Sequence, residues 1–295
     1  MQRIVQGRSA TLSQAFEIDG TATDPSPDVA TIGITREDGT SLVAAGTAAT
    51  EVGTGTVSYT LTPAQTALLD VLTVTWTAVF GSQIQSFVTR VEIRGDVLFS
   101  IADARLLSPL GNTVTYPAAR IATARTLAET ALEEACRVPF APTYFRVTLD
   151  GDGRTDLLLP VVRPLTVTTA TVDGRTVDPA TIGLYDDGRL YLATGWSTGW
   201  SASSPGAATR GRRNVVIKGT YGYPYPPPRV SRAALLLAKR FLVDLPVSDR
   251  ATSLTTQDGT TQFLVTAGVR QAITDVPECN AVIREYGVRQ AFAIA

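Results

Sequence analysis

The sequence contains no histidine and only two cysteines, Cys136 and Cys279. Histidine is the commonest general acid or base at neutral pH and the commonest metal ligand. Its absence excludes Ser-His-Asp and Cys-His catalysis and every zinc site that uses histidine. Two cysteines are too few for an all-cysteine zinc site, which takes about four, and their spacing gives no support for a disulfide. A hydrolase built on two carboxylates needs no histidine, but no motif points to such a pair. We therefore expect no enzyme activity, no cofactor and no metal.

Long hydrophobic runs are also missing. No run approaches the roughly 18 apolar residues that a membrane-spanning helix requires. The first residues, from Met1 to Gln6, include no apolar segment of signal-peptide length. We therefore expect no membrane partner, and a protein that stays in the cytoplasm of its host or is built into a particle there.

An excess of charge of either sign is absent. The chain has 26 basic and 27 acidic residues and a formal net charge of -1. This balance argues against a general nucleic-acid binder, which normally carries a basic excess. A net charge near zero also gives little resistance to self-association. Apolar residues make up 44% of the 295 positions, which suffices for a hydrophobic core and favours two domains over one.

The first 94 residues show the pattern of antiparallel strands. Apolar and polar residues alternate between turn residues in the segments 31–36, 56–61, 72–80 and 86–93. The third of these is the clearest, with Val74, Trp76 and Ala78 on one face. Thr62 and Gln65 form a capping-box pattern for a single helical turn. Strands of this number and spacing predict an immunoglobulin-like β-sandwich.

The periodicity changes after Gly95 and Asp96. A short helix is predicted over residues 99–107 and a longer one over 117–137, with Pro117 at its first helical position. In the longer helix, apolar residues recur at helical spacing. They are Ile121, Ala124, Ala128, Ala131 and Ala135, with Leu127 and Leu132 beside them, and Cys136 is expected to be a small buried residue.

Residues 145–221 return to a strand pattern. Two strands, 145–149 and 156–160, flank a Gly-rich turn that we interpret as a hairpin. Its carboxylates at positions 150, 152 and 156 resemble part of a calcium loop, but Arg154 occupies a ligand position. Asp173-Gly174 and Asp187-Gly188 are hairpin-turn signals. Residues 194–213 are predicted to be a long loop, followed by a strand over 214–221.

Two further helices are predicted near the C-terminus. The segment from Val230 to about residue 245 is apolar on nearly all sides, so we expect burial on most of its surface. Residues 250–272 are predicted to form an exposed hairpin. The last helix is expected to begin with Asp275 as its cap and Glu278 in a capping box, and to end at Gly287. An apolar tail, residues 288–295, follows.

Five segments, in this order, resemble the head-to-tail connector (adaptor) family of long-tailed bacteriophages. They are Cys-Arg-Val-Pro-Phe at 136–140, Leu-Pro-Val-Val-Arg-Pro-Leu-Thr-Val at 159–167, Val-Ile-Lys-Gly-Thr-Tyr-Gly-Tyr at 216–223, residues 251–260, and Asp-Val-Pro-Glu-Cys-Asn-Ala-Val-Ile-Arg-Glu-Tyr at 275–286. The resemblance spans about residues 97–287. Cys279 and Asn280 depart from the usual residues of the closing segment, and residues 1–94 lie outside the family's common core.

The resemblance implies a structural subunit of the virion neck. Such a subunit forms a homo-oligomeric ring, typically of twelve copies, under the portal protein and above the stopper and tail terminator proteins. Genomic DNA passes through the axial channel without sequence-specific binding. The expected fold is α+β: a β-sandwich at 1–94, a connector domain at 95–287 with a helical bundle and an inserted antiparallel β region, and a C-terminal arm at 288–295.

Several residues are candidates for contacts with the portal or with a neighbouring subunit. The basic cluster Arg210, Arg212 and Arg213 suits an acidic protein surface, although it is equally a solvated loop. Trp196 and Trp200 are either interface anchors or core residues of their own domain. Arg232 and Lys239 lie seven positions apart and therefore share one face of a helix that is otherwise core. In the tail, Val288, Arg289, Phe292 and Ile294 are expected to dock on another chain, with a frayed terminus as the alternative.

A second function remains open at this point. The chain also fits a tail or baseplate protein whose β-sandwich binds a host surface glycan. Exposed aromatic side chains on the sandwich would favour this alternative.

Overall fold

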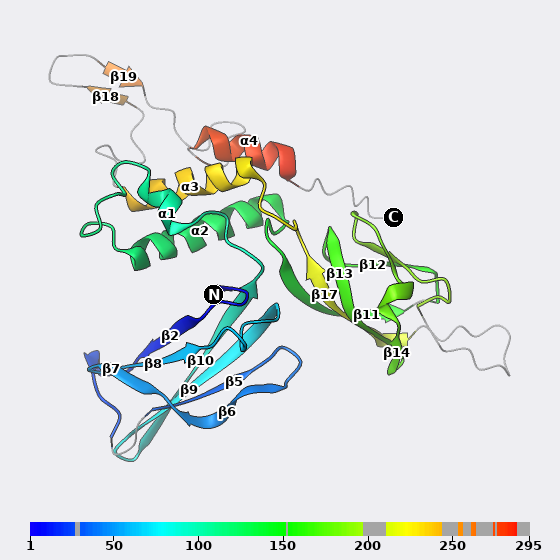
Figure 1. Cartoon of the computed structure of the whole chain (residues 1–295), viewed down its shortest axis with the longest axis horizontal. Coiled ribbons are helices and arrows are strands. Elements are labelled where there is room, and N and C mark those ends of the chain that lie inside the picture. The colour runs from blue at the N-terminus through cyan, green and yellow to red at the C-terminus, as the bar shows by residue number, and fades with distance from the viewer. Residues whose placement is uncertain are drawn as a thin grey trace. The chain divides into compact units, whose positions relative to one another are not determined.

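The computed structural model describes residues 1–26, 30–151, 153–196, 211–243, 253–255, 261–263, 274 and 276–287. The fold is α+β, as predicted, and strands predominate over helices. Figure 1 shows the arrangement of the elements along the chain. Within the described residues, no helix combines the length and the apolar character that crossing a membrane requires.

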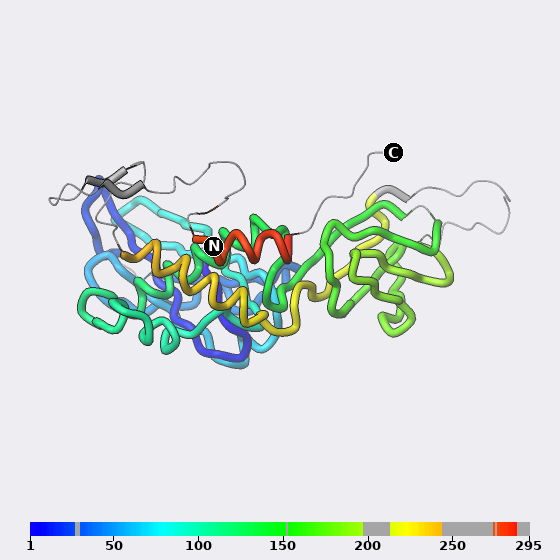
Figure 2. Tube along the Cα trace, turned by 90° about the horizontal axis from the view of Figure 1, so that it is seen from above, coloured from blue at the N-terminus to red at the C-terminus, as the bar shows by residue number. Residues whose placement is uncertain are grey.

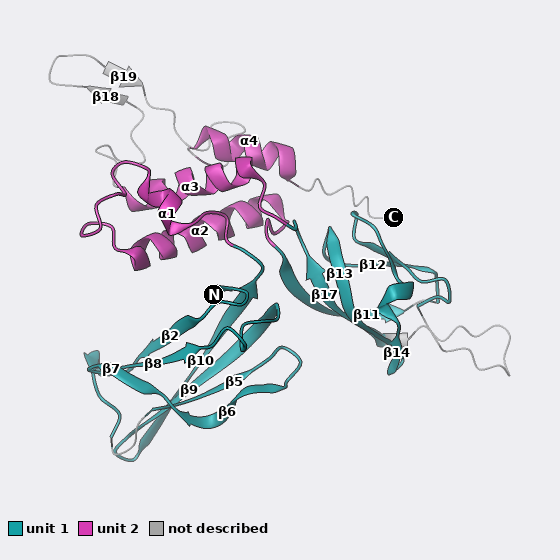
Figure 3. Cartoon of the chain, viewed as in Figure 1, with its two compact units in different colours: residues 1–96, 142–224 teal, residues 97–141, 225–295 magenta. Residues whose placement is uncertain are grey.

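The chain forms two compact units, which Figure 3 colours separately. Unit 1 consists of residues 1–96 and 142–224 and contains the sheets of the sandwich and of the inserted β region. Unit 2 consists of residues 97–141 and 225–295 and contains the helices. The chain therefore passes between the units three times, after Asp96, Ala141 and Pro224. The division into a sandwich, a connector domain and an arm stays a prediction.

The N-terminal part of unit 1 contains two larger sheets with a common core. One has the strand order β1-β10-β9-β5-β6 and the other β2-β8-β7, and β3 and β4 form a separate two-stranded sheet. The strands are β1 (Gln2–Val5), β2 (Ala10–Ala15), β3 (Glu17–Ile18), β4 (Thr21–Ala22), β5 (Thr31–Thr35), β6 (Ser41–Ala48), β7 (Thr50–Gly53), β8 (Thr56–Leu61), β9 (Asp70–Phe80) and β10 (Gln83–Arg94). Whether this sandwich is immunoglobulin-like stays a prediction.

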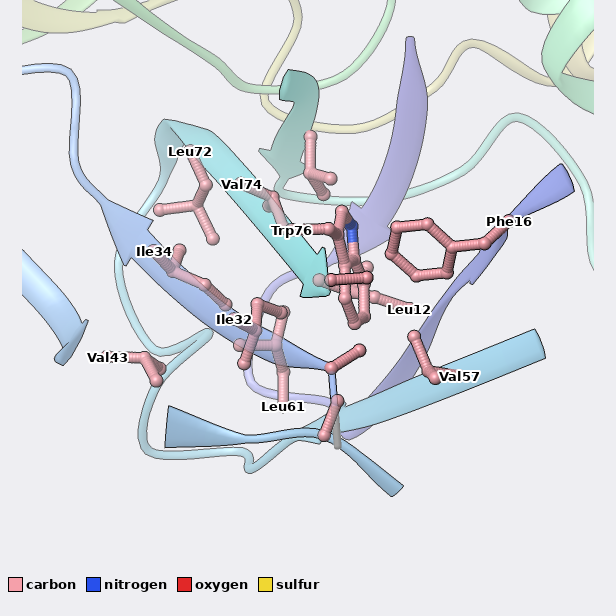
Figure 4. Packing of buried hydrophobic residues seen from close by; sticks show 14 of the residues in the cluster. Leu12, Phe16, Ile32, Ile34, Val43, Val57, Leu61, Leu72, Val74 and Trp76 are labelled. Atoms are coloured by element: carbon pink, nitrogen blue, oxygen red, sulfur yellow. The ribbon is translucent and has the colours of Figure 1, made fainter. Parts of the chain in front are cut away.

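Strand β9 is the centre of this core and confirms the alternation read from the sequence. Every second residue from Asp70 to Phe80 is buried, and Val74, Trp76 and Ala78 are each at most 1% exposed. Their side chains meet Leu12, Val57 and Leu61 of the other sheet in one hydrophobic cluster (Figure 4). A side-chain period of two buries one face of each sheet against the other.

The capping box in the turn after β8 is also confirmed. The Thr62 amide donates to Gln65 Oε1 over 2.8 Å, and the Gln65 amide donates to Thr62 Oγ1 over 3.3 Å. A backbone bond from the Thr66 amide to the Thr62 carbonyl closes the single helical turn.

The inserted β region of unit 1 has two sheets, with orders β11-β17-β13-β14 and β12-β16-β15. Their strands are β11 (Thr143–Gly151), β12 (Asp156–Leu158), β13 (Pro164–Val172), β14 (Arg175–Val177), β15 (Gly183–Leu184), β16 (Arg189–Tyr191) and β17 (Gly211–Tyr221), with a 3-10 turn, η1 (Pro179–Thr181). Side chains of both sheets form one cluster, which includes Phe145, Leu190, Trp196 and Ile217.

Two predicted hairpins of this region are confirmed and one is wrong. Asp173 and Gly174, both with positive φ, connect the antiparallel strands β13 and β14. The segment with Gly188 connects β15 and β16 in the same way. Strands β11 and β12 do not form a hairpin, because β11 pairs with β17 and β12 pairs with β16. The Gly-rich segment between them instead carries the chain from one sheet to the other.

The helices of unit 2 come from two separate stretches of sequence. They are α1 (Ile101–Arg105), α2 (Ala118–Cys136), α3 (Pro228–Leu242) and α4 (Pro277–Tyr286). Helix α3 packs against α2 and α4, and α2 also contacts α1 and α4. Figures 1 and 2 show α3 beside α4. The Phe140 and Tyr286 rings meet edge to face, with centroids 5.7 Å apart. Cys136 and Cys279 are both fully buried thiols, as expected for Cys136.

The helix boundaries differ from the predicted ones in detail. Pro117 is the N-cap of α2, one position earlier than predicted. Helix α4 has Val276 as its N-cap and no side-chain cap, so the predicted capping box is wrong, while Asp275 lies outside the described residues. Gly287 does follow the last turn, with its amide bonded to the Ile283 carbonyl. The strands β18 (Ser253–Thr255) and β19 (Thr261–Phe263) confirm the hairpin predicted for 250–272.

The prediction that α3 is apolar on nearly all sides is wrong. Its buried residues form one face: Val230, Ala233, Ala234, Leu237, Ala238 and Leu242. Arg232 on the opposite face is exposed, and Leu235, Leu236 and Lys239 are half-buried. The run of leucines and alanines hid this polarity, because the basic residues between them fall on a single face at helical spacing.

The buried face of α2 is rotated from the predicted one, since Glu129, Glu133 and Cys136 are also buried. Ile121, Ala124, Ala128 and Leu132 are buried as expected. Ala131 and Ala135 are only half-buried, and Leu127 is 55% exposed. A stripe repeated every seven residues drifts around a straight helix of 3.6 residues per turn, so its members do not all face the core.

Candidate assembly surfaces

Helix α2 presents an outward face of small, largely uncharged side chains, which we name the α2 outer face. It consists of Ala119, Arg120, Thr123, Thr126, Leu127, Thr130, Ala131 and Glu134, which are exposed or half-buried, with Arg120 and Glu134 as its charged members. Each threonine hydroxyl on it donates to the carbonyl four residues earlier, over 3.1, 3.1 and 2.8 Å. These hydroxyls are therefore satisfied within the helix, and the face offers mainly methyl groups to a neighbour.

Helix α3 presents a second face, which we name the α3 outer face. Arg232, Leu235, Leu236 and Lys239 form it, at a spacing of three and four residues. The helix thus confirms that Arg232 and Lys239 share one face. Two leucines lie between two cations, a composition that suits contact with a mixed apolar and acidic surface. Because α2 and α3 pack their buried faces within the unit, the two outer faces point to different sides of it.

Two buried carboxylates fix the ends of the first helical segment. Glu129 is 1% exposed, and its Oε1 accepts from the Leu98 amide over 2.8 Å. Glu133, one turn later, accepts from the Phe140 amide over 3.2 Å. Both segments that lead into and out of α2 are therefore held to the same helix. This role was not predicted from the sequence, although two glutamates four residues apart within an apolar stripe are a signal of buried, hydrogen-bonded carboxylates.

The basic cluster is only partly within the described chain. Arg210 lies outside the described residues, and of Arg212 the structure describes the backbone alone. Strand β17 begins at Gly211, so Arg212 and Arg213 belong to a strand and not to the predicted loop. Arg213 is exposed, has φ 52°, and donates its amide to the Asp150 carboxylate. The exposed position of Arg213 suits a surface contact.

Trp196 lies in the core of the inserted β region. Its side chain is fully buried, and Nε1 donates to the Thr155 carbonyl over 3.0 Å. A Cβ on Gly151 would lie 1.8 Å from the Trp196 carbonyl oxygen, so only glycine fits beside it. Of the two alternatives for this tryptophan, the structure places it in its own domain. Trp200, Val288, Arg289, Phe292 and Ile294 lie outside the described residues.

A polar joint links the sandwich to the inserted β region within unit 1. Arg94, at the end of β10, is 2% exposed and donates from Nη2 to Thr143 Oγ1 of β11 over 3.1 Å. Its Nε lies 3.8 Å from the Glu92 carboxylate. The Gly95 amide donates to the Pro142 carbonyl over 2.8 Å. This joint connects residues about fifty positions apart, and no local pattern in the sequence predicted it.

An exposed contact extends the joint at the turn after β5. Lys218 of β17 lies 3.3 Å from the Asp38 carboxylate. Hydrogen bonds from Thr40 lower the pKa of Asp38 to about 2, and Lys218 acts in the same direction. Burial raises the pKa of Tyr144 in β11 to about 12, and the nearby Asp70 carboxylate adds to this shift. Both groups therefore keep one protonation state across the physiological range.

The comparisons with known proteins give no family for this chain. No protein-family model matches it, and no curated protein matches it. Within the part of the chain that the structure describes, no three or more Cys, Asp or Glu residues are grouped so that they could hold a metal ion. The function must therefore be argued from the surfaces and from the order of the elements.

Proposed function

We propose that this chain is a head-to-tail connector of a tailed bacteriophage, a structural subunit that assembles into a ring around a channel for DNA. The observation that carries the proposal is the discontinuous helical unit. Its two halves, residues 97–141 and 225–295, flank a β region. This is the order of elements that the resemblance to the connector family implies for residues 97–287.

The α2 and α3 outer faces support a head-to-tail contact between copies. Apolar groups of Leu127 on one face suit Leu235 and Leu236 on the other. Glu134 at the end of the α2 outer face is opposite in charge to Arg232 and Lys239. A contact between two different faces is heterologous, and when its rotation closes it generates a ring. Opposite charges at the rim then select the register more than they add affinity.

Charge exchange between the two faces tests the proposal. Glu134→Lys and Lys239→Glu each place like charges at the contact, and each should lower ring formation about tenfold or more. The double variant restores opposite charges and should recover most of the ring. Native mass spectrometry and negative-stain imaging give the readout, with the protein alone and together with the portal protein of its own virus.

Leu106→Asp is the matched control. Leu106 is 84% exposed in unit 2 and belongs to neither outer face, so this variant should assemble as the parent does. A parent protein that stays monomeric at high concentration and does not bind the portal would contradict the proposal. If the two single variants and the double variant all form rings as the parent does, the contact between the α2 and α3 outer faces is contradicted, but the connector function is not.

One observation favours the second candidate function, a tail or baseplate protein that binds a host glycan. The Phe87 side chain on the sandwich is 38% exposed, and aromatic rings stack on sugars. Binding of the protein to host surface polysaccharide, lost in Phe87→Ala, would support this candidate. Absence of polysaccharide binding, together with formation of a ring on the portal protein, would support the connector proposal instead.

A further inference from the structure

Strand β10 has an open edge along most of its length. In the sheet order β1-β10-β9-β5-β6, strand β9 pairs with β10 from Gln83 to Ile93. On the other side, β1 pairs only with residues 91–94. Within the described residues, no strand pairs with the remaining side of residues 83–90.

The register shows which backbone groups point out of this edge. The Arg94 carbonyl accepts from the Gln6 amide, so Arg94 directs its backbone groups to the side of β1. The pairing with β9 runs without a bulge, and backbone groups alternate in direction along a strand. Ile84, Ser86 and Val88 therefore direct their N–H and C=O groups to the open side.

This edge lacks the features that usually protect sheet edges. Proline, bulges and charged side chains are the common devices. Residues 83–89 contain no proline and no charge, and Arg90 at the end of the open stretch is paired with Glu37, whereas the opposite edge strand β6 pairs with β5 through register shifts. Three apolar side chains are exposed along the open edge: Ile84 is 70% exposed, Val88 64% and Phe87 38%. The Phe87 ring leans on Phe16 of the core, with centroids 5.5 Å apart.

We propose that a second copy of this chain covers the edge, with the two β10 strands antiparallel about a two-fold axis at Ser86. In this register Ser86 faces Ser86 of the second copy, and Ile84 faces its Val88. All three facing pairs then consist of residues whose backbone groups point across the contact, so each pair exchanges two hydrogen bonds. The pairs of Ile84 with Val88 also bring together the two most exposed apolar side chains of the strand.

The self-complementarity of the strand is the reason to choose a second copy as the occupant. Any edge strand can pair antiparallel with its own copy, but in this strand the pairing also places the exposed apolar Ile84 opposite the exposed apolar Val88. A two-fold contact is isologous and closes at two copies. It therefore does not build the proposed ring, and it describes the protein before assembly. The inference stands whether or not the connector proposal holds.

Cysteine crosslinking in the full-length protein tests the register. Ser86→Cys should form a disulfide-linked dimer under mild oxidation, because the two sulfurs face each other. Val88→Cys faces Ile84 and should crosslink at least tenfold less. The native thiols do not interfere, because Cys136 and Cys279 are buried.

Lysine substitution tests the contact itself. Val88→Lys should weaken dimerisation at least tenfold in sedimentation equilibrium, since it places an unpaired charge opposite Ile84 of the second copy. Ala44→Lys on the exposed part of β6 is the matched control and should dimerise as the parent does. Circular dichroism confirms that each variant is folded.

Three outcomes would overturn the inference: a parent that is monomeric at all concentrations, a dimer that tolerates Val88→Lys, or equal crosslinking of both cysteine variants. The Glu134 and Lys239 charge variants report on the ring separately, because those residues belong to unit 2. A parent protein that forms no ring but still gives the Ser86→Cys crosslink would therefore count only against the proposed function.

Discussion

Replacing Trp196 with alanine should lower the free energy of unfolding of the inserted β region. It should not change assembly with other subunits. The side chain is fully buried among residues of both sheets of that region. Replacing a buried tryptophan with alanine costs about 3–5 kcal/mol, of which the bond from Nε1 accounts for about 1 kcal/mol. Trp196→Phe keeps most of the packing and should cost only about 1–2 kcal/mol. The Thr155 carbonyl stays satisfied in both variants, because it also accepts from the Leu192 amide.

Urea unfolding followed by far-UV circular dichroism measures the effect. Tyr191→Ala is the control, since that ring belongs to the same region but is 39% exposed. The expected order of unfolding midpoints is parent and Tyr191→Ala highest, Trp196→Phe lower and Trp196→Ala lowest. If Trp196→Ala unfolds at the parent's midpoint and instead impairs assembly, Trp196 is not a core residue, and its role as an interface anchor is supported.

Three further predictions follow from the joint and the thiols. Gly95→Ala places a Cβ 2.8–2.9 Å from the Pro142 ring, so it should cost roughly 1–3 kcal/mol in a urea titration; an unchanged midpoint would show that the ring can move. Cys136 should not react with a thiol reagent at pH 8 until the protein is unfolded, because burial raises its pKa to about 11; rapid reaction of the native protein would contradict this. Asp38→Asn should lower stability by less than about 1 kcal/mol at pH 7, since the group is largely exposed. That difference should shrink as pH falls from the ordinary pKa of 3.8 through about 2, where the wild-type carboxylate is half protonated in the folded state; a difference as large at pH 2 as at pH 7 would exclude the charge as its source.

Short-range patterns predicted the elements that depend on neighbouring residues. The alternation along β9, the capping box at Thr62 and the turn at Asp173-Gly174 are all set within a few residues, and all three are confirmed. The segment after β11 shows the limit of such signals. A Gly-rich turn between two strands has the same local pattern whether the strands pair with each other or belong to different sheets.

The parts that the sequence did not reveal depend on contacts between distant residues. Arg94 and Thr143 are 49 positions apart, and Asp38 and Lys218 are 180 apart. Nothing local to either residue specifies the other, so no periodicity can identify the joint. The polarity of α3 could have been predicted from the sequence. Arg232 and Lys239 share one face, and two basic residues on one face are not consistent with a helix that is buried on most sides.

The split origin of the helical unit has a consequence for synthesis on the ribosome. Helix α2 emerges with the apolar side chains of Ile121 and Leu132, but its partner α3 is translated only after residues 142–224. During that interval the nascent chain carries an apolar stripe with no native cover, the kind of surface that chaperones bind. Any product that terminates before Pro228 keeps that stripe bare and should be degraded or aggregate, which gives the cell a means to discard incomplete copies.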